Sequence, residues 1–450
     1  MTNHDSTNLG TEKIGKLIFR LAIPSVIAQI INMLYNIVDR VYIGHIPETG
    51  APALTGLGLC APVLYIIAAF AALVFAGSSA RAAISMGKKD TEGAEKILGN
   101  SFAFLVLISV LVTIIVEVFA RPLLFLFGAS EVTVPYALSY MQIYALGTIF
   151  VSITLGMNAF ITAQGFAKIS MLTVIVGAIC NIILDPIFIF GFGWGVRGAA
   201  FATILSQAVS TVWVLFFLTG KRTVLKLRLS NLRIDWRLMG PCLALGLSPF
   251  IMQSTEGILS VCFNSSLQKY GGDLAVGAMT ILATVNQCIF LVVSGFTQGA
   301  LPIISYNYGA GNPKRVKEAF KLLLLVCVGY TMVMWAAIML FPGRIAGILT
   351  SDVELRSYAA WAMRIYGAMF GIFGIQTACQ QTFIGIGNAK TSLFLALLRK
   401  IILLIPLIYI LPHFFADQTM AVYLAEPVAD TIAVTTTGIL FFIQFRKALS

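Results

Sequence analysis

The chain has 450 residues, of which 58% are hydrophobic and 11% charged, and its mean hydropathy is +0.91. Soluble domains are about half apolar and about a quarter charged, so this composition excludes a water-soluble enzyme; a disordered chain would need low hydrophobicity and high charge. The net charge of +11 comes without aromatic-interleaved basic patches, which argues against a nucleic acid partner. The basic residues lie in short tracts between apolar runs, as beside an anionic bilayer surface. We therefore expect an integral membrane protein.

The apolar runs predict twelve transmembrane helices. A spanning helix needs about 20 predominantly apolar residues, and a lone strand in lipid would leave its backbone groups unpaired. The predicted spans cover approximately residues 15–43, 53–86, 94–120, 132–163, 169–190, 196–219, 239–268, 274–307, 317–341, 354–385, 391–411 and 419–445. Several exceed one bilayer thickness, so we expect tilted or bent helices. The polar segment before the first span carries no cleavable signal, because the apolar run after it is too long.

The basic residues also predict the orientation. With the N-terminus in the cytoplasm, the Lys and Arg residues of the cytoplasmic side outnumber those of the outer side by about three to one. The positive-inside rule then places both termini in the cytoplasm. The basic residues assigned to the outer side are Arg40, Arg121, Arg197, Lys269, Arg344, Arg356 and Arg364.

The sequence repeats itself at a constant offset of 222 residues. The offset pairs Tyr136, Met141, Gly77, Gly87 and Lys168 with Tyr358, Met363, Gly299, Gly309 and Lys390. Such a regular repeat over half the chain indicates a duplicated unit. Because each half holds six spans, both halves enter from the same side and form parallel repeats, a transporter architecture. We predict an N-terminal lobe over residues 1–220, a basic linker over 221–238 and a C-terminal lobe over 239–450.

Polar residues form stripes on equivalent helices of the two halves. The first span carries Ser25, Gln29, Asn32, Asn36 and Asp39 at helical spacing; the seventh carries Gln253, Glu256, Ser260 and Asn264. A polar face within a membrane must contact protein or water. We predict a wet substrate cavity between the halves, with polar contacts between tightly packed helices as the alternative. Its candidate residues are Gln29, Asn32, Tyr35, Asn36, Asn158, Gln253, Glu256, Gln287, Gln376 and Arg399.

Acids within spans suggest a cation site, because each costs about 2.5–3.5 kcal/mol at the bilayer centre. Asn181 and Asp185 share one helix face, and Pro186 cannot donate to the Ile182 carbonyl, which would leave that oxygen free to coordinate a cation. The competing interpretation of Asp185 is a structural hydrogen bond in a kinked helix. For Asp39 the competing interpretation is an ordinary charge at a helix end.

Charged residues also gather in the last two spans. Glu426 and Asp430 share a face, and Arg399 lies near mid-membrane, so we expect it to face the cavity or to pair with one of these acids or with Glu256. A gating role and a structural ion pair both stay open. Lys400 would snorkel toward the bilayer surface.

The sequence gives no sign of an enzyme. It has no GxxxxGK[ST] loop for ATP, and no HExxH motif or zinc-type cluster. All seven cysteines lie inside apolar runs without a CxxC spacing, which argues against a disulfide framework or a metal site. We expect no cofactor and no metal beyond a coupling ion.

With these features the chain resembles the multidrug and toxic compound extrusion (MATE) family. The resemblance rests on LAIPSVIAQIINMLYNIVDRVYIG (21–44), NIILDPIFIFGFGWGVRGAAFAT (181–203), YGGDLAVGAMTI (270–281), ISMGKKD (84–90) and SYNYGAGNP (305–313). It implies an all-α membrane protein with a V-shaped pair of lobes. It also implies a multi-pass protein of the bacterial cytoplasmic membrane, monomeric and without an ATP-binding subunit.

The resemblance further implies a secondary active antiporter that exports small organic, often cationic and amphipathic compounds in exchange for Na⁺ or H⁺. The implied cation site comprises Asp39, Asn181, Asp185 and Thr203. Some family members use an acidic pair in the C-terminal lobe. Glu256 matches the first acid, but glutamines stand where the second is expected, at Gln376, Gln380 and Gln381.

Three other functions compete with multidrug export. A flippase for lipid-linked oligosaccharide would favour a strongly cationic cavity, whereas this chain has several acids beside Arg399. A narrow-specificity metabolite exporter would share the fold and differ only in the residues around its substrate. A membrane enzyme or receptor would gather polar residues at one end instead of along stripes shared by both repeats.

Overall fold

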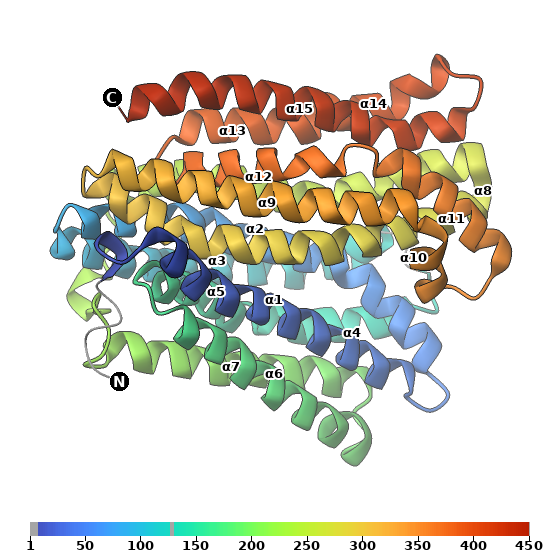
Figure 1. The fold of residues 1–450 in the computed structure, drawn as a ribbon. Coiled ribbons are helices and arrows are strands. Elements are labelled where there is room, and N and C mark those ends of the chain that lie inside the picture. The colour runs from blue at the N-terminus through green and yellow to red at the C-terminus, as the bar shows by residue number, and fades with distance from the viewer. Residues whose placement is uncertain (1–7, 127–129, 450) are drawn as a thin grey trace.

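The computed structural model describes residues 8–126 and 130–449, and over these ranges the chain consists of helices and loops without a strand. The predicted polar N-terminal segment falls partly outside this description, in residues 1–7. Most helices run nearly parallel to one another, with the red helices of the C-terminal part on one side and the green helices α6 and α7 on the other (Figure 1). The start of the described chain and the end of the last helix lie at the same end of the molecule.

Six spans make up the first half. Its elements are η1 (Asn8–Gly10), α1 (Ile14–Gly44), α2 (Gly50–Gly87), α3 (Thr91–Leu126), α4 (Val134–Leu146), α5 (Thr148–Ala163), α6 (Ala167–Pro186), the π-helical turn η2 (Ile187–Gly191) and α7 (Val196–Thr219). Helices α4 and α5 form one broken span, bent by 54° at Gly147. The π-helical turn follows Pro186, whose missing N–H prevents a regular continuation of α6.

The second half repeats this arrangement. After η3 (Leu229–Asn231) in the linker come α8 (Trp236–Gly309), α9 (Pro313–Leu340), α10 (Pro342–Leu349), α11 (Val353–Tyr366), α12 (Phe370–Gly385), α13 (Ala389–Leu397), the π-helical η4 (Leu398–Leu404), α14 (Ile405–Ile410), η5 (Leu411–His413) and α15 (Gln418–Ala448). Gly272 divides α8 into two arms through a left-handed backbone conformation (φ 66°, ψ −161°). Glycine adopts this conformation without steric cost.

The helices account for the predicted spans. Within residues 8–126 and 130–449, nine helices are long and apolar enough to cross a membrane, and the α4–α5 pair makes a tenth. The two arms of α8 count once in that number, and α11 with α12 covers the predicted span 354–385. The all-α, twelve-span prediction is confirmed; the breaks within the fourth and tenth spans are additional.

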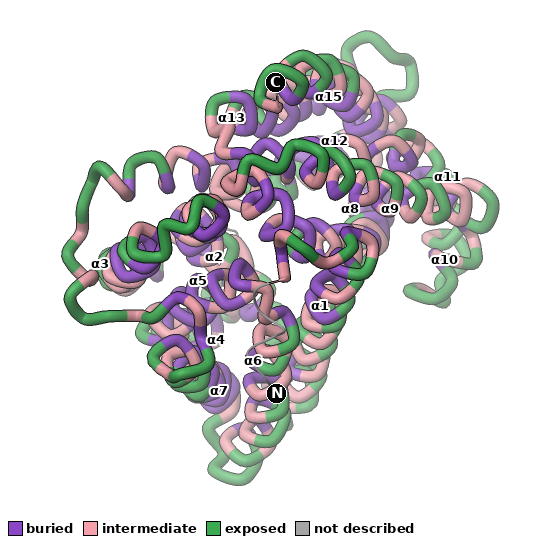
Figure 2. Tube along the Cα trace, turned by 60° about the vertical axis from the view of Figure 1, so that its left-hand side comes forward, coloured by how far each residue is buried: buried purple, intermediate pink, exposed green. Residues whose placement is uncertain are grey.

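Apolar side chains cover the outside of the bundle. Figure 2 shows exposed residues on the outward faces of the helices, with many of the buried ones turned toward their neighbours. Phe216 on α7 is 78% exposed and Phe442 on α15 is 73% exposed. In water such surfaces would be unfavourable, but in a bilayer they contact acyl chains of equal polarity.

The two halves meet closely near the end that carries the termini. A β-carbon on Gly87 would lie 2.0 Å from the Tyr306 carbonyl oxygen, and one on Gly309 would lie 2.0 Å from the Ile84 carbonyl oxygen. Each pair is related to the other by the 222-residue offset, so α2 and the second arm of α8 pack reciprocally. Only glycine permits this approach, because any side chain would overlap the facing backbone. The two halves of the chain are therefore in close backbone contact at this end.

Candidate cation and substrate sites

Three helices of the first half bring a group of oxygen-bearing side chains together. Asn181 on α6 donates through Nδ2 to Asp185 Oδ1 (3.2 Å) and to Thr203 Oγ1 on α7 (3.4 Å). Asp185 is fully buried and Asn181 and Thr203 are 2% and 7% exposed. Asp39 on α1, 7% exposed, lies close enough to interact electrostatically with Asp185. The structure therefore gathers all four residues of the cation site implied by the sequence.

Several oxygens of this group are buried and unsatisfied. Among the described residues, Asp39 Oδ1, Asn181 Oδ1 and Asp185 Oδ2 accept no hydrogen bond from the protein. A buried acceptor without a partner costs about 1–3 kcal/mol, and carboxylate and amide oxygens are the ligands that hard cations prefer. The arrangement can accept a small cation or a proton.

Tyrosines surround these acids. Tyr35 interacts electrostatically with Asp39 and Asp185, and Tyr140 also interacts electrostatically with Asp39. Tyr140 and Tyr144 on α4 stack at 5.9 Å between ring centres. The sequence predicts that Tyr35 lines the substrate cavity. It does not mark the two α4 tyrosines as site residues, because they lie in a separate span and belong to no recognisable motif.

The polar stripes of α1 and α8 are accessible away from the closely packed end. Asn32, Asn36 and Gln287 are exposed, as is the Glu256 side chain, at 53%, whereas Gln253 is half-buried. Gln29 Nε2 donates to Gln298 Oε1 (3.3 Å), which joins α1 to the second arm of α8. These residues form an exposed polar surface, and their contact with a substrate stays a prediction.

Two candidate cavity residues lie inside the helix packing. Asn158 on α5 donates to the Ser170 carbonyl oxygen (3.2 Å), and its Oδ1 is buried. Gln376 on α12 is 2% exposed and accepts from Thr437 Oγ1 (2.5 Å). Their part in a substrate cavity stays a prediction.

A buried charge network occupies the second half. Arg399 Nε lies 2.7 Å from Asp430 Oδ1, and Arg399 Nη2 lies 2.8 Å from Glu426 Oε1. The guanidinium carbon is 4.4 Å from the centre of the Phe373 ring. All three charged residues are at most 7% exposed.

Lys400 extends this network toward the polar surface. It is 5% exposed and pairs with Glu256, so the expected snorkelling is wrong. Neighbouring residues of an α-helix point about 100° apart, but Arg399 and Lys400 lie in the π-helical η4, and both reach acids. Nothing in the sequence marks this turn as π-helical.

Comparison with known proteins identifies the family. The sequence model of the MatE family matches residues 24–187 and 249–410, once in each half of the chain. The protein belongs to the MatE family of multidrug efflux transporters. The two matches agree with the internal repeat, since each covers most of one half.

Individual relatives cover nearly the whole chain. The multidrug export protein MepA of Staphylococcus aureus (strain NCTC 8325 / PS 47) is 22% identical over 402 residues, covering 89% of this chain and 88% of MepA. A multidrug resistance MATE family transporter solved in an outward-facing conformation is 24% identical, with a TM-score of 0.92 over 100% of this chain and 99% of the other. A MOP superfamily transporter from Pyrococcus furiosus, described as having a binding pocket of reverse polarity, gives the same identity and TM-score over the full length of both chains. At this identity the solved structures establish the fold.

Proposed function

We propose that this MATE transporter is a secondary antiporter that exports small organic cations in exchange for Na⁺ or H⁺. The single observation that carries the proposal is the set of buried, unsatisfied oxygens on Asp39, Asn181 and Asp185. A cation arriving there removes the cost of desolvating two neighbouring carboxylates, so binding and conformation become coupled. MepA, a relative named as a multidrug exporter, supports the substrate class.

The coupling ion acts through α1. Asp39 lies on α1, whereas Asp185 and Thr203 lie on α6 and α7. Neutralising the carboxylates allows α1 to pack more closely on α6, and the same helix carries the polar residues Gln29, Asn32 and Asn36 toward α8. A shift of α1 therefore alters the substrate surface, which links inward movement of the ion to outward release of the substrate.

The two lobes are the moving units. We assign residues 1–220 and 239–450 to them and residues 221–238 to the linker, with both termini in the cytoplasm of a bacterial cell and the protein acting as a monomer without an ATP-binding subunit. The glycine contact at the terminal end then corresponds to closure of the cytoplasmic side. The exposed polar faces of α1 and α8 would open to the outside.

The network around Arg399 holds the second lobe together. Its acids are already paired with Arg399 and Lys400, unlike those of the first half. We assign coupling to Asp39, Asn181, Asp185 and Thr203, and an architectural role to Arg399, Glu426 and Asp430. Glu256 pairs with Lys400 and has a side chain that is 53% exposed, so it links this network to the polar surface of α8.

The test is ethidium efflux from proteoliposomes under imposed Na⁺ or pH gradients, comparing the wild type with Asp185→Asn. The matched control is Asp273→Asn, which changes an exposed aspartate at the start of the second arm of α8. We expect gradient-driven efflux to fall at least tenfold in Asp185→Asn and to be unchanged in the control. The gradient that drives the wild type identifies the ion.

Ethidium binding to the detergent-solubilised proteins separates coupling from folding. Asp185→Asn should bind ethidium with an affinity close to that of the wild type, because the substrate surface is intact. Full efflux by Asp185→Asn would refute the assigned cation site while leaving a transporter. Wild-type protein that binds ethidium but moves none under either gradient would refute antiport of this substrate class.

A further inference from the structure

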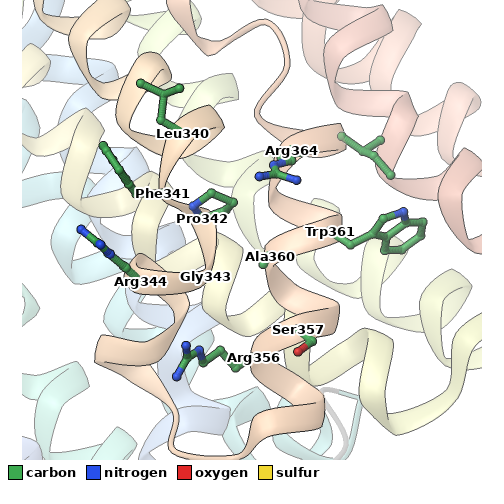
Figure 3. A pocket seen from close by; sticks show the side chains of 11 residues that line it. Leu340, Phe341, Pro342, Gly343, Arg344, Arg356, Ser357, Ala360, Trp361 and Arg364 are labelled. Carbon is green, nitrogen blue, oxygen red and sulfur yellow. The ribbon is translucent and has the colours of Figure 1, made fainter.

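An open cavity lies far from the cation site, between α10 and α11. Its volume is about 520 Å³, and it is at the end of the molecule opposite the termini. Phe341, Pro342 and Arg344 line it from the α10 side. Figure 3 shows Pro342 between α10 and α11, with Phe341 and Arg344 on the side of α10 that is turned away from α11. Arg364 and Arg356 approach it from α11. Three arginines from two helices thus surround one hollow.

The positive charge of this cavity is not compensated. Among the ion pairs of residues 8–126 and 130–449, none involves Arg344, Arg356 or Arg364. Asp352 caps α11 by accepting from the Glu354 and Leu355 amides (2.9 and 3.1 Å) and is directed to the backbone. No acid lines the hollow.

Other contacts hold the arginines in place. Arg364 Nε donates to the Met339 carbonyl oxygen (3.3 Å) near the end of α9, and the Arg344 guanidinium lies 5.3 Å from the Phe341 ring centre. The Arg356 side chain lies beside Gly347 of α10, where a β-carbon would be 3.4 Å from its Cδ. All three arginines are exposed, and these contacts leave guanidinium N–H groups for a ligand. Guanidinium groups bind phosphate oxygens through paired hydrogen bonds.

The rim of the cavity is strongly apolar. Leu340 is 68% exposed and Phe341 is 50% exposed, and both line the cavity at the end of the spanning helix α9. The ligand therefore needs an anionic group beside long apolar chains at the depth of a bilayer interface. A soluble phosphate would leave this rim in contact with water, whereas a phospholipid covers it with acyl chains.

We propose that this cavity binds the headgroup of an anionic phospholipid, with its phosphate among the three arginines and its acyl chains against Leu340 and Phe341. The lipid would belong to the outer leaflet if the termini are cytoplasmic. It bridges α10 and α11 and thereby stiffens the outer end of the second lobe. This site is independent of the ion and substrate sites of the proposed antiporter.

Native mass spectrometry of the full chain with phosphatidylglycerol, and with phosphatidylcholine of matched acyl chains, tests the proposal. We expect the wild type to prefer phosphatidylglycerol and the variant Arg344→Gln/Arg356→Gln/Arg364→Gln to lose about 100-fold of that preference, since each basic residue at an anionic surface contributes about fivefold. The control Arg197→Gln/Lys269→Gln removes basic residues of the same side outside the cavity and should keep the preference. Thermal unfolding of each variant verifies folding.

Three outcomes would overturn the proposal. Equal retention of the two lipids by the wild type would exclude a specific headgroup site. An equal loss of preference in the control variant would indicate general attraction to a positive surface. Displacement of phosphatidylglycerol by millimolar inorganic phosphate would show that the cavity recognises a small anion.

Discussion

Removal of Arg399 should destabilise the second lobe more than removal of its whole charge network. In Arg399→Met, Glu426 and Asp430 lose the guanidinium that lies 2.8 and 2.7 Å away and stay buried. The triple variant Arg399→Met/Glu426→Gln/Asp430→Asn removes all three charges at similar volume. Comparing the two variants separates the destabilisation caused by unpaired buried charges from the net contribution of the whole network to the free energy of unfolding.

The expected magnitude follows from burial. Breaking a buried ion pair by deleting one partner costs about 3–5 kcal/mol, whereas replacing all partners is often nearly neutral. Loss of the contact with Phe373, 4.4 Å from the guanidinium, adds about 1–2 kcal/mol to both variants. We therefore expect the single variant to lose about 4–7 kcal/mol of unfolding free energy and the triple variant about 1–3 kcal/mol.

Equilibrium unfolding with sodium dodecyl sulfate in mixed micelles measures these free energies. Arg197→Met, which removes an exposed arginine at the start of α7, serves as the control and should change the free energy by less than about 0.5 kcal/mol. A single variant as stable as the triple variant, or more so, would refute the reasoning, because it would mean that the acids do not need the arginine.

The remaining predictions concern the contact between the lobes and the linker. Gly87→Leu should prevent the close approach of the lobes, so that cysteine probes buried at the terminal end become accessible. Gly329→Leu is the control, because a β-carbon there meets nothing within 4 Å, and it should leave the probes buried. The rate at which a membrane-impermeant maleimide labels the probes measures their accessibility. Gln164 Oε1 accepts hydrogen bonds at 2.8–2.9 Å from the Thr223 hydroxyl and from the Val224 and Leu225 amides, at the start of the 221–238 linker. Gln164→Leu removes this acceptor and should speed tryptic cleavage of the linker. Gln418→Leu, at an exposed position, is the control; cleavage at the same rate in both variants would contradict the role of this amide.

The sequence predicted the spans and the repeat because bilayer thickness and composition dictate them locally. The approach of Asn181 to Asp185 also follows from spacing, since residues four apart share a helix face. Thr203 and Asp39 come from other helices, and only the family resemblance placed them beside this pair. The structure brings these side chains together, and the binding of a cation by them stays a prediction.

The remainder depended on the geometry between helices. Lys400 lies in a π-helical segment and pairs with Glu256 on α8, a contact between distant parts of the chain that no local sequence pattern indicates. The arginine cavity could not be predicted from the sequence either, because Arg344 lies on a short helix after the α9 span and Arg356 lies on the next helix. Sequence placed both on the outer side of the membrane but could not bring them together.

The reciprocal packing of Gly87 and Gly309 bears on the ancestry of the chain. A homodimer of a single six-helix unit would make this contact twice across a twofold axis, with the same glycine and the same carbonyl on each side. Duplication and fusion would keep the contact while freeing each copy to diverge elsewhere. Among the described residues, Asp39 and Asp185 form no ion pair in the first half, whereas Glu426, Asp430 and Glu256 pair with Arg399 and Lys400 in the second, and these are two outcomes of such divergence.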